Sequence, residues 1–142
     1  MVGLADLLVS AGLTRERLEE CRRISGSSGE PLDKVILSKE YLEEGKLLQA
    51  YASHLGYAYL PRLDGFQVPA LFVSRIPVQF TRNYNLIALN ASDEGCLRVA
   101  TCSPVDPQPM DDLAALLGAE IEPVLAPRSE ITTLIARAYR HK

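Results

Sequence analysis

The sequence has neither a long apolar run nor an excess of positive charge, and each absence excludes a class of function. Its longest hydrophobic runs are far too short to cross a bilayer, so no direct membrane insertion is expected. Basic and acidic residues total 15 and 18, which gives a net charge of −3. Residues 1–60 carry 7 basic and 9 acidic side chains, and residues 61–142 carry 8 and 9. This even balance predicts no binding to nucleic acid or to anionic lipid.

Residues that bind metals or perform catalysis are also scarce. The cysteines Cys21, Cys96 and Cys102 are odd in number and irregularly spaced, which favours reduced core or strand residues over a metal site. His54 near a helix end and His141 in the C-terminal tail are not expected to share a metal ion. No glycines surround a lysine and a hydroxyl residue as in a P-loop, so we expect no ATP hydrolysis. We predict a chain that is not an enzyme and uses no cofactor.

Two charged clusters have structural explanations that we prefer to functional ones. Asp111 and Asp112 would point about 100° apart on a helix, so we expect them to stabilise its start rather than to act as paired catalytic carboxylates. A second cluster consists of four arginines interleaved with glutamates. Its members are Arg15, Arg17, Arg22 and Arg23. The mixture predicts a solvated face, available to a protein partner. A serine or cysteine dyad formed only by folding is not excluded by distance in sequence.

A hairpin organises the C-terminal half. The β-prone runs 86–89 and 97–101 flank a turn-forming segment that ends at Gly95, which is free to adopt a positive φ. Prolines in 103–109 then end the second strand, because they lack the N–H that a sheet ladder requires. Further along, the alternating segment 120–125 predicts a third strand, and Pro123 places it at the sheet edge.

Apolar spacing and capping residues predict helices on both sides of a domain boundary. In residues 1–60 we expect two related helix pairs, with a stop at Gly12, an N-cap at Thr14 and a flexible connector at 25–29. Residues 38–55 allow one long helix, or a break at Tyr41-Leu42 and a helix that starts near Glu43. A short extended segment follows at 57–60. Leu48 is expected in the buried stripe of this half.

The second half of the sequence predicts a small unit of helices and strands after a linker at 61–68. Helices are expected at 69–74, 77–84 and 111–117, and the amphipathic pattern that includes Leu134 predicts a closing helix. The predicted fold class is therefore α+β, with a four-helix unit at 1–60 and a small α+β unit at 69–142. The N-terminus lacks the positive start of a signal peptide, so we expect a cytoplasmic protein.

The order of these segments is similar to a known family. LADLLVSAGLTRERLEE, LLQAYASHLGYAYL and AEIEPVLAPRSEITTLIARAY resemble the first helix pair, the helix-to-strand passage and the closing strand and helix of one domain. This is the N-terminal domain of type II secretion and type IV pilus assembly ATPases. The resemblance implies a docking or regulatory domain that couples an ATPase to a membrane-platform protein. Its protein partner would be that platform or the ATPase core, and the chain would be peripheral at the inner membrane through it.

Some members of this family bind cyclic di-GMP through two tandem motifs, which this chain matches only in part. Each motif has an Arg-Leu-Gly start, a later glycine, spaced leucines and a final glutamine. In the first motif Gly12 is kept, while Gly3 stands for the arginine. In the second, Pro31 replaces the arginine and Asp33 and Glu40 replace glycines. These acids would repel a dianionic ligand if they face it.

The alternative function implied by the resemblance is a cyclic di-GMP sensor with a degenerate motif. His54 stands for the final glutamine of the second motif. The binding residues would be those that keep the motif skeleton, together with this histidine. They are Leu4, Leu8, Gly12, Leu18, Leu32, Ile36, Leu47 and His54. Because the arginine and glutamine positions are lost, we expect weak binding at most.

Overall fold

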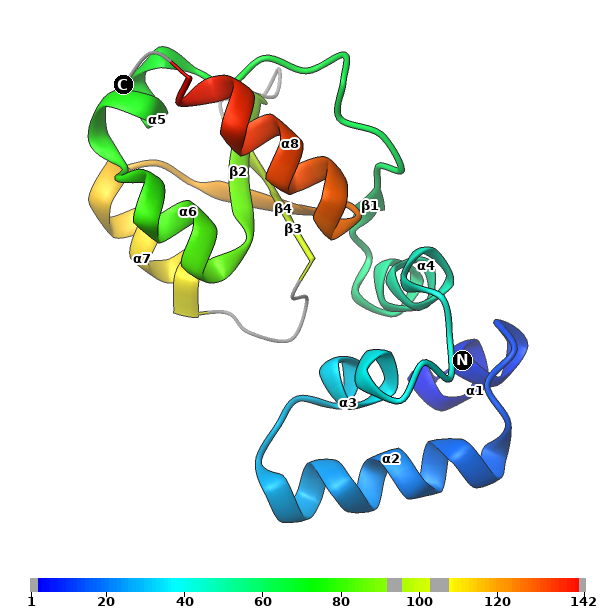
Figure 1. The fold of residues 1–142 in the computed structure, drawn as a ribbon. Helices are drawn as coiled ribbons and strands as arrows, with labels where there is room; N and C mark the ends of the chain where they lie inside the picture. Colours follow the sequence, from blue (N-terminus) through cyan, green and yellow to red (C-terminus); the bar gives the residue numbers. More distant parts are fainter. Residues whose placement is uncertain (1–2, 92–95, 103–107, 141–142) are drawn as a thin grey trace. The chain divides into compact units, whose positions relative to one another are not determined.

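Helices dominate the structure, a computed structural model that describes residues 3–91, 96–102 and 108–140. The chain divides into two compact units, Met1–Tyr57 and Ala58–Lys142, which we call unit 1 and unit 2 (Figure 1). The described part contains eight helices and one four-stranded sheet, which confirms the predicted α+β class. None of the described helices is both long and apolar enough to span a bilayer.

Unit 1 is built from two helix pairs. The helices are α1 (Leu4–Ser10), α2 (Arg15–Ser28), α3 (Leu32–Ser38) and α4 (Glu44–Leu55). Helix α1 packs on α4, and α2 packs on α3. The predicted N-cap is confirmed, because Thr14 Oγ1 accepts a hydrogen bond of 3.2 Å from the backbone N–H of Arg17. The connector expected at 25–29 is instead the last turn of α2, which ends at Gly29 with a φ of 81°.

The break between α3 and α4 decides the alternative left open for residues 38–55. Lys39 caps α3, Glu40 adopts a left-handed φ of 57°, and α4 begins after Glu43. The two-helix alternative is therefore confirmed. Leu42 lies in this break and is buried, so the turn supplies an apolar side chain to the core. The unit 1 core consists of Leu8, Leu13, Leu18, Cys21, Val35, Ile36, Leu42, Leu47, Leu48, Ala50, Tyr51 and Ala52.

A four-stranded sheet forms the centre of unit 2. Its strands are β1 (Ala58–Tyr59), β2 (Leu86–Ala91), β3 (Leu97–Thr101) and β4 (Ile121–Leu125), in the order β1-β4-β3-β2. Strands β2 and β3 are antiparallel, which confirms the predicted pairing; Gly95 lies outside the described residues. Strand β4 is parallel to both of its neighbours.

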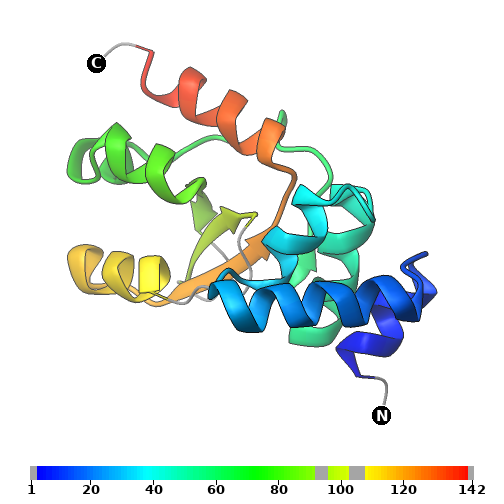
Figure 2. The ribbon, with the colours of Figure 1, turned by 60° about the horizontal axis from the view of Figure 1, so that its bottom comes forward.

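Four helices cover this sheet. They are α5 (Ala70–Arg75), α6 (Val78–Tyr84), α7 (Gln108–Leu117) and α8 (Arg128–Ala138). Helix α8 packs on β2 and β3, α6 packs on β2 and α8, and α7 packs on β4 and α5. Figures 1 and 2 show α6 and α8 close together over the strands. Both faces of β2 are buried, since Leu86, Ile87, Ala88 and Leu89 are all inaccessible to solvent.

The prediction that β4 is an edge strand is wrong, because β4 lies between β1 and β3. The backbone groups of Glu120 and Ala126 bond to β3, so the alternate residues, including Pro123, turn their backbone groups toward β1. Strand β1 pairs only with Val124 and Leu125. The absent N–H of Pro123 thus falls beyond the start of β1, where no ladder bond is lost.

The predicted boundaries also need correction. The division falls after Tyr57, so β1 belongs to unit 2 rather than to a unit ending at residue 60. The segment 61–68 is not a linker but part of unit 2. Leu63 is buried in its core, and its N–H donates a hydrogen bond of 2.9 Å to Glu130 Oε1 on α8. Arg137 donates to the carbonyl oxygen of Phe66 at 2.7 Å. Such long-range contacts cannot be predicted from the amino-acid composition of the segment itself.

Candidate functional site

The residues of the degenerate motif all lie in unit 1, but they do not form one surface. Leu8, Leu18, Ile36 and Leu47 are buried in the core of the unit. Leu4 and Leu32 are partly buried, whereas Gly12 and His54 are exposed. At these four core positions the apolar spacing of the motif supports helix packing in this structure.

Two positions of the motif keep the backbone conformation that suits glycine. Gly12 follows α1 with a φ of 123°. Glu40, which replaces a motif glycine, still adopts a φ of 57° and is exposed. A left-handed φ strains a residue with a Cβ atom. At Glu40 the turn geometry is therefore retained although the glycine that suits it has been lost.

Asp33 does not face the solvent, where it could repel a ligand, because only 1% of its surface is exposed. Among the described residues its Oδ1 has no hydrogen-bond partner, and neither does the buried hydroxyl of Tyr51. Burial raises the pKa of the Asp33 carboxyl above its usual range. Burial, and secondarily the charge of Asp33, raise the pKa of Tyr51. Unit 1 thus carries an acid and a tyrosine in its interior.

A surface cluster joins α2 to the turn after α3. The Tyr41 hydroxyl donates to the Glu20 carboxylate, 3.0 Å from Oε1 and 2.9 Å from Oε2. Arg17 lies over the Tyr41 ring with its Cζ 4.6 Å from the ring centroid, and Lys39 Nζ is 3.6 Å from Glu20 Oε2. The hydrogen bond to Glu20 is the main reason that the pKa of Tyr41 is raised. Sequence reasoning missed this cluster, because its members are far apart in sequence.

The arginine cluster of α2 is exposed, as predicted. Three of its members have contacts: Arg17 is stacked on Tyr41, Arg15 Nη2 lies 3.9 Å from Asp6 Oδ1, and Arg22 Nη1 lies 3.7 Å from Glu19 Oε1. Exposed ion pairs of this length contribute little to stability. They nevertheless support a solvated face of mixed charge rather than an anion site.

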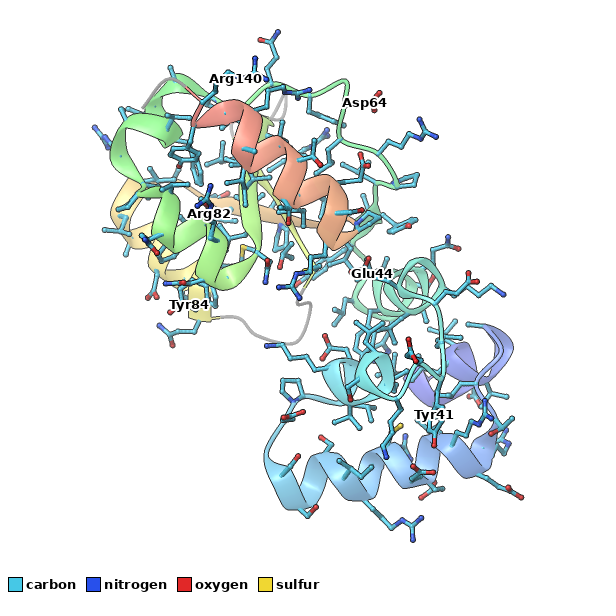
Figure 3. All side chains as sticks on the ribbon, in the orientation of Figure 1. Tyr41, Glu44, Asp64, Arg82, Tyr84 and Arg140 are labelled. Atoms are coloured by element: carbon cyan, nitrogen blue, oxygen red, sulfur yellow. The ribbon has the colours of Figure 1, made fainter. Side chains whose placement is uncertain are left out.

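Two of the hollows in the described part of unit 2 lie outside the predicted site. One has a volume of about 330 Å³ and lies between the segment 64–68 and α8, with Arg137 and Leu134 in its wall. The other, of about 370 Å³, lies at the junction of α5 and α6. It is lined by Val73, Ser74, Arg75, Ile76, Pro77, Val78, Arg82 and Tyr139. We call this second hollow the α5–α6 groove. Arg82 is labelled on α6 in Figure 3.

Among the described residues, no cluster of three His, Cys, Asp or Glu side chains is placed to hold a metal ion. Cys21 is buried, whereas Cys96 and Cys102 are partly buried, and none of the three forms a disulfide. Asp112 Oδ1 accepts a hydrogen bond of 2.9 Å from Gln108 Nε2, in the first turns of α7. This contact is a hydrogen bond between residues four apart, of the kind that stabilises a helix.

Comparison with known proteins shows that the chain is similar in sequence to two ATPases. It is 25% identical over 140 residues to the type IV pilus assembly ATPase PilB of Myxococcus xanthus. It is also 25% identical over 138 residues to the type IV pilus assembly ATPase PilB of Thermus thermophilus. These alignments cover 98% and 96% of this chain but only 24% and 15% of the relatives. The chain thus spans a quarter or less of their length.

Solved structures share the fold over nearly the whole chain. MshE with cyclic di-GMP gives a TM-score of 0.73 at 26% identity, covering 98% of this chain and 100% of that one. The N-terminal domain of XpsE gives 0.75 at 22% identity and covers 98% of both chains, which shows the fold. The family model described as the MshEN domain matches residues 55–142, more than half of the chain and all of unit 2. This chain therefore belongs to the MshEN domain family.

Proposed function

We propose that this chain is a non-catalytic docking or regulatory domain that couples a secretion or pilus assembly ATPase to a membrane-platform protein. The observation that carries the proposal is the likeness of 98% of the chain to the N-terminal domain of XpsE, and of 98% and 96% of it to parts of two PilB ATPases. The sequence has no P-loop, so hydrolysis would be the task of a separate catalytic part. The chain would work in the cytoplasm, held peripherally at the inner membrane by its partner.

Two exposed leucines of unit 2 suit the docking role. Leu71 on α5 is 55% exposed and Leu116 on α7 is 58% exposed. The helices that carry these two leucines contact each other. Contiguous exposed apolar side chains mark protein interaction surfaces. We assign the platform protein to this surface, which we call the leucine face.

The test is to measure binding of the full-length ATPase to the cytoplasmic part of its platform protein. Introducing charge through Leu71→Asp with Leu116→Asp should weaken binding by about tenfold or more, since each buried leucine contributes on the order of 1.5–3 kcal/mol. Thr132→Asp with Thr133→Asp adds the same charge to exposed positions of α8 and is the matched control. Equal binding by both double variants would remove the leucine face as the docking surface. An absence of binding by the unmodified protein would overturn the function.

A cyclic di-GMP sensor is the second candidate, favoured by the likeness to MshE with cyclic di-GMP and by the retained turns at Gly12 and Glu40. Against it, Gly3 and Pro31 provide no guanidinium at the arginine positions. Charge-assisted hydrogen bonds contribute about 1.5–3 kcal/mol each, so losing two should lower affinity by orders of magnitude. Calorimetric titration should show weak or no binding. A sub-micromolar dissociation constant would favour the sensor instead.

A further inference from the structure

We propose that the α5–α6 groove of unit 2 binds an acidic, partly apolar segment of a protein partner, with Arg75 and Arg82 pairing with its carboxylates. The inference rests on the proposed function in one respect, namely that the segment belongs to the partner that the domain docks. It adds a second contact, separate from the leucine face, and this contact requires acidic residues in the partner.

The groove is built on a fixed floor. Ile76, at the junction of α5 and α6, is buried, and its carbonyl oxygen accepts a hydrogen bond of 2.7 Å from the hydroxyl of Tyr139. Val73 and Val78 form part of the apolar lining. The tyrosine thereby ties the end of α8 to the junction of the two short helices. A volume of about 370 Å³ is enough to receive a few side chains without rearrangement.

Two arginines give this apolar hollow its chemistry. Arg75 ends α5 and Arg82 lies in α6, and both are exposed. Within the described ranges neither side chain forms an ion pair. Arg137 differs, since its guanidinium donates to the carbonyl oxygens of Asp64 and Phe66. A guanidinium beside an apolar floor favours a carboxylate next to an apolar side chain, because it can form two parallel hydrogen bonds with it.

The fold of unit 2 separates charges that the sequence mixes. The helices α5, α6 and α8 carry four arginines and a single acid, Glu130, whose Oε1 already accepts from the backbone of Leu63. The arginines are Arg75, Arg82, Arg128 and Arg137. Helix α7 carries two aspartates and no basic residue. The helices α5, α6 and α8 therefore carry more positive than negative charge although the unit is balanced overall, and this excess would steer an acidic segment toward the groove.

A protein segment fits these features better than a membrane does. The positive groups border a hollow that can enclose a side chain, whereas a lipid surface is contacted by protruding basic residues. Residues 70–84 also hold no run of adjacent basic residues such as those that bind anionic lipid. Anionic vesicles are accordingly the alternative outcome of the test.

The test is an NMR titration of the ¹⁵N-labelled chain at low salt. The probe is the peptide acetyl-Glu-Glu-Leu-Glu-Phe-Glu-amide, and its matched control has glutamine in place of each glutamate. Binding in the groove should shift the amide signals of residues 73–76, 78, 82 and 139. The glutamine peptide should bind about tenfold more weakly or not at all, because it lacks the charge-assisted bonds. Equal binding of the two peptides, or shifts spread over unit 1, would overturn the proposal.

Charge-reversal variants locate the contact. Arg75→Glu and Arg82→Glu should each reduce peptide affinity about tenfold, and the milder Arg82→Gln should show a smaller loss with an otherwise unchanged spectrum. Arg62→Glu reverses an exposed charge of the same unit outside the groove and should leave affinity nearly unchanged. An equal loss with Arg62→Glu would mean unspecific attraction. Binding to phosphatidylcholine vesicles containing about 30% phosphatidylserine, without peptide binding, would assign the arginines to a membrane instead.

The two proposals fail in distinguishable ways. If Leu71→Asp with Leu116→Asp abolishes platform binding while the peptide still binds in the groove, the groove and the leucine face are separate contacts, as proposed. If the arginine variants lose the peptide but bind the platform protein with unchanged affinity, the segment does not belong to that partner and this inference is overturned. The proposed function would survive that result.

Discussion

The two units are stabilised in different ways, and their cores differ in whether buried polar groups have hydrogen-bond partners. Unit 1 packs four helices by side-chain contacts and encloses an aspartate and a tyrosine, each with a polar atom that has no partner among the described residues. Unit 2 packs helices on a sheet whose strands come from distant parts of the sequence. Its buried Thr81 hydroxyl donates to the Val78 carbonyl oxygen at 2.7 Å. A satisfied polar group costs little, whereas an unpartnered one destabilises the fold. The described core of unit 1 thus carries a destabilising contribution from unpartnered polar atoms.

The largest expected effects test whether the units are independent. Leu48 of α4 and Leu134 of α8 are buried, as predicted. Leu48→Ala and Leu134→Ala should each lower the free energy of unfolding by about 2–5 kcal/mol. Hydrogen exchange measured by mass spectrometry should then quicken in α1–α4 for the first variant and in β2–β4 for the second. Leu71→Ala, at an exposed position, is the control. If either core variant accelerated hydrogen exchange equally in both units, the two units would not be independently stable.

The next effect concerns the buried acid of unit 1. Because burial raises the folded-state pKa of Asp33 above its unfolded value of about 4, the folded state binds this proton more tightly. Its contribution to stability is complete below the unfolded pKa and is lost as the pH rises through the folded pKa. Asp33→Asn should therefore raise the free energy of unfolding at pH 7 by about 1–3 kcal/mol.

Denaturant unfolding of the Asp33→Asn variant at several pH values checks this effect. The advantage of the variant should shrink toward pH 4, and Asp64→Asn at an exposed position of unit 2 should show no comparable gain. A variant less stable than the unmodified protein at pH 7 would show that the charged carboxylate is satisfied by a partner.

The smallest effect compares two left-handed residues, one in each unit. Glu40 has a φ of 57° and Asn85 a φ of 52°. Asparagine tolerates this region because its short side chain can bond locally, whereas glutamate is strained there by about 1 kcal/mol. Glu40→Gly should raise the melting temperature more than Asn85→Gly. Calorimetry of the two variants decides this, and an equal or reversed order would show that the backbone strain of Glu40 is negligible.

The sequence by itself determined the local elements. Thr14 and Gly12 mark helix ends because capping and positive φ are properties of a few neighbouring residues. Two β-prone runs around a turn-forming segment predicted β2 and β3, and the 3.6-residue period predicted α8 with Leu134 on its buried side. The order of these elements was enough to indicate the family. All of these signals act within about ten residues of the chain.

Only the tertiary structure decided the sheet order, the burial of Asp33 and the segregation of charge in unit 2. Pro123 predicted an edge strand, yet β1 begins just past the absent N–H and β4 is internal. Asp33 predicted a charge that could face a ligand, yet α3 turns it into the core. Arg75 and Arg82 are seven residues apart on two helices and border one groove because Tyr139, far along the chain, ties the junction in place. Each outcome depends on partners distant in sequence, whose positions are fixed by the packing of the whole unit.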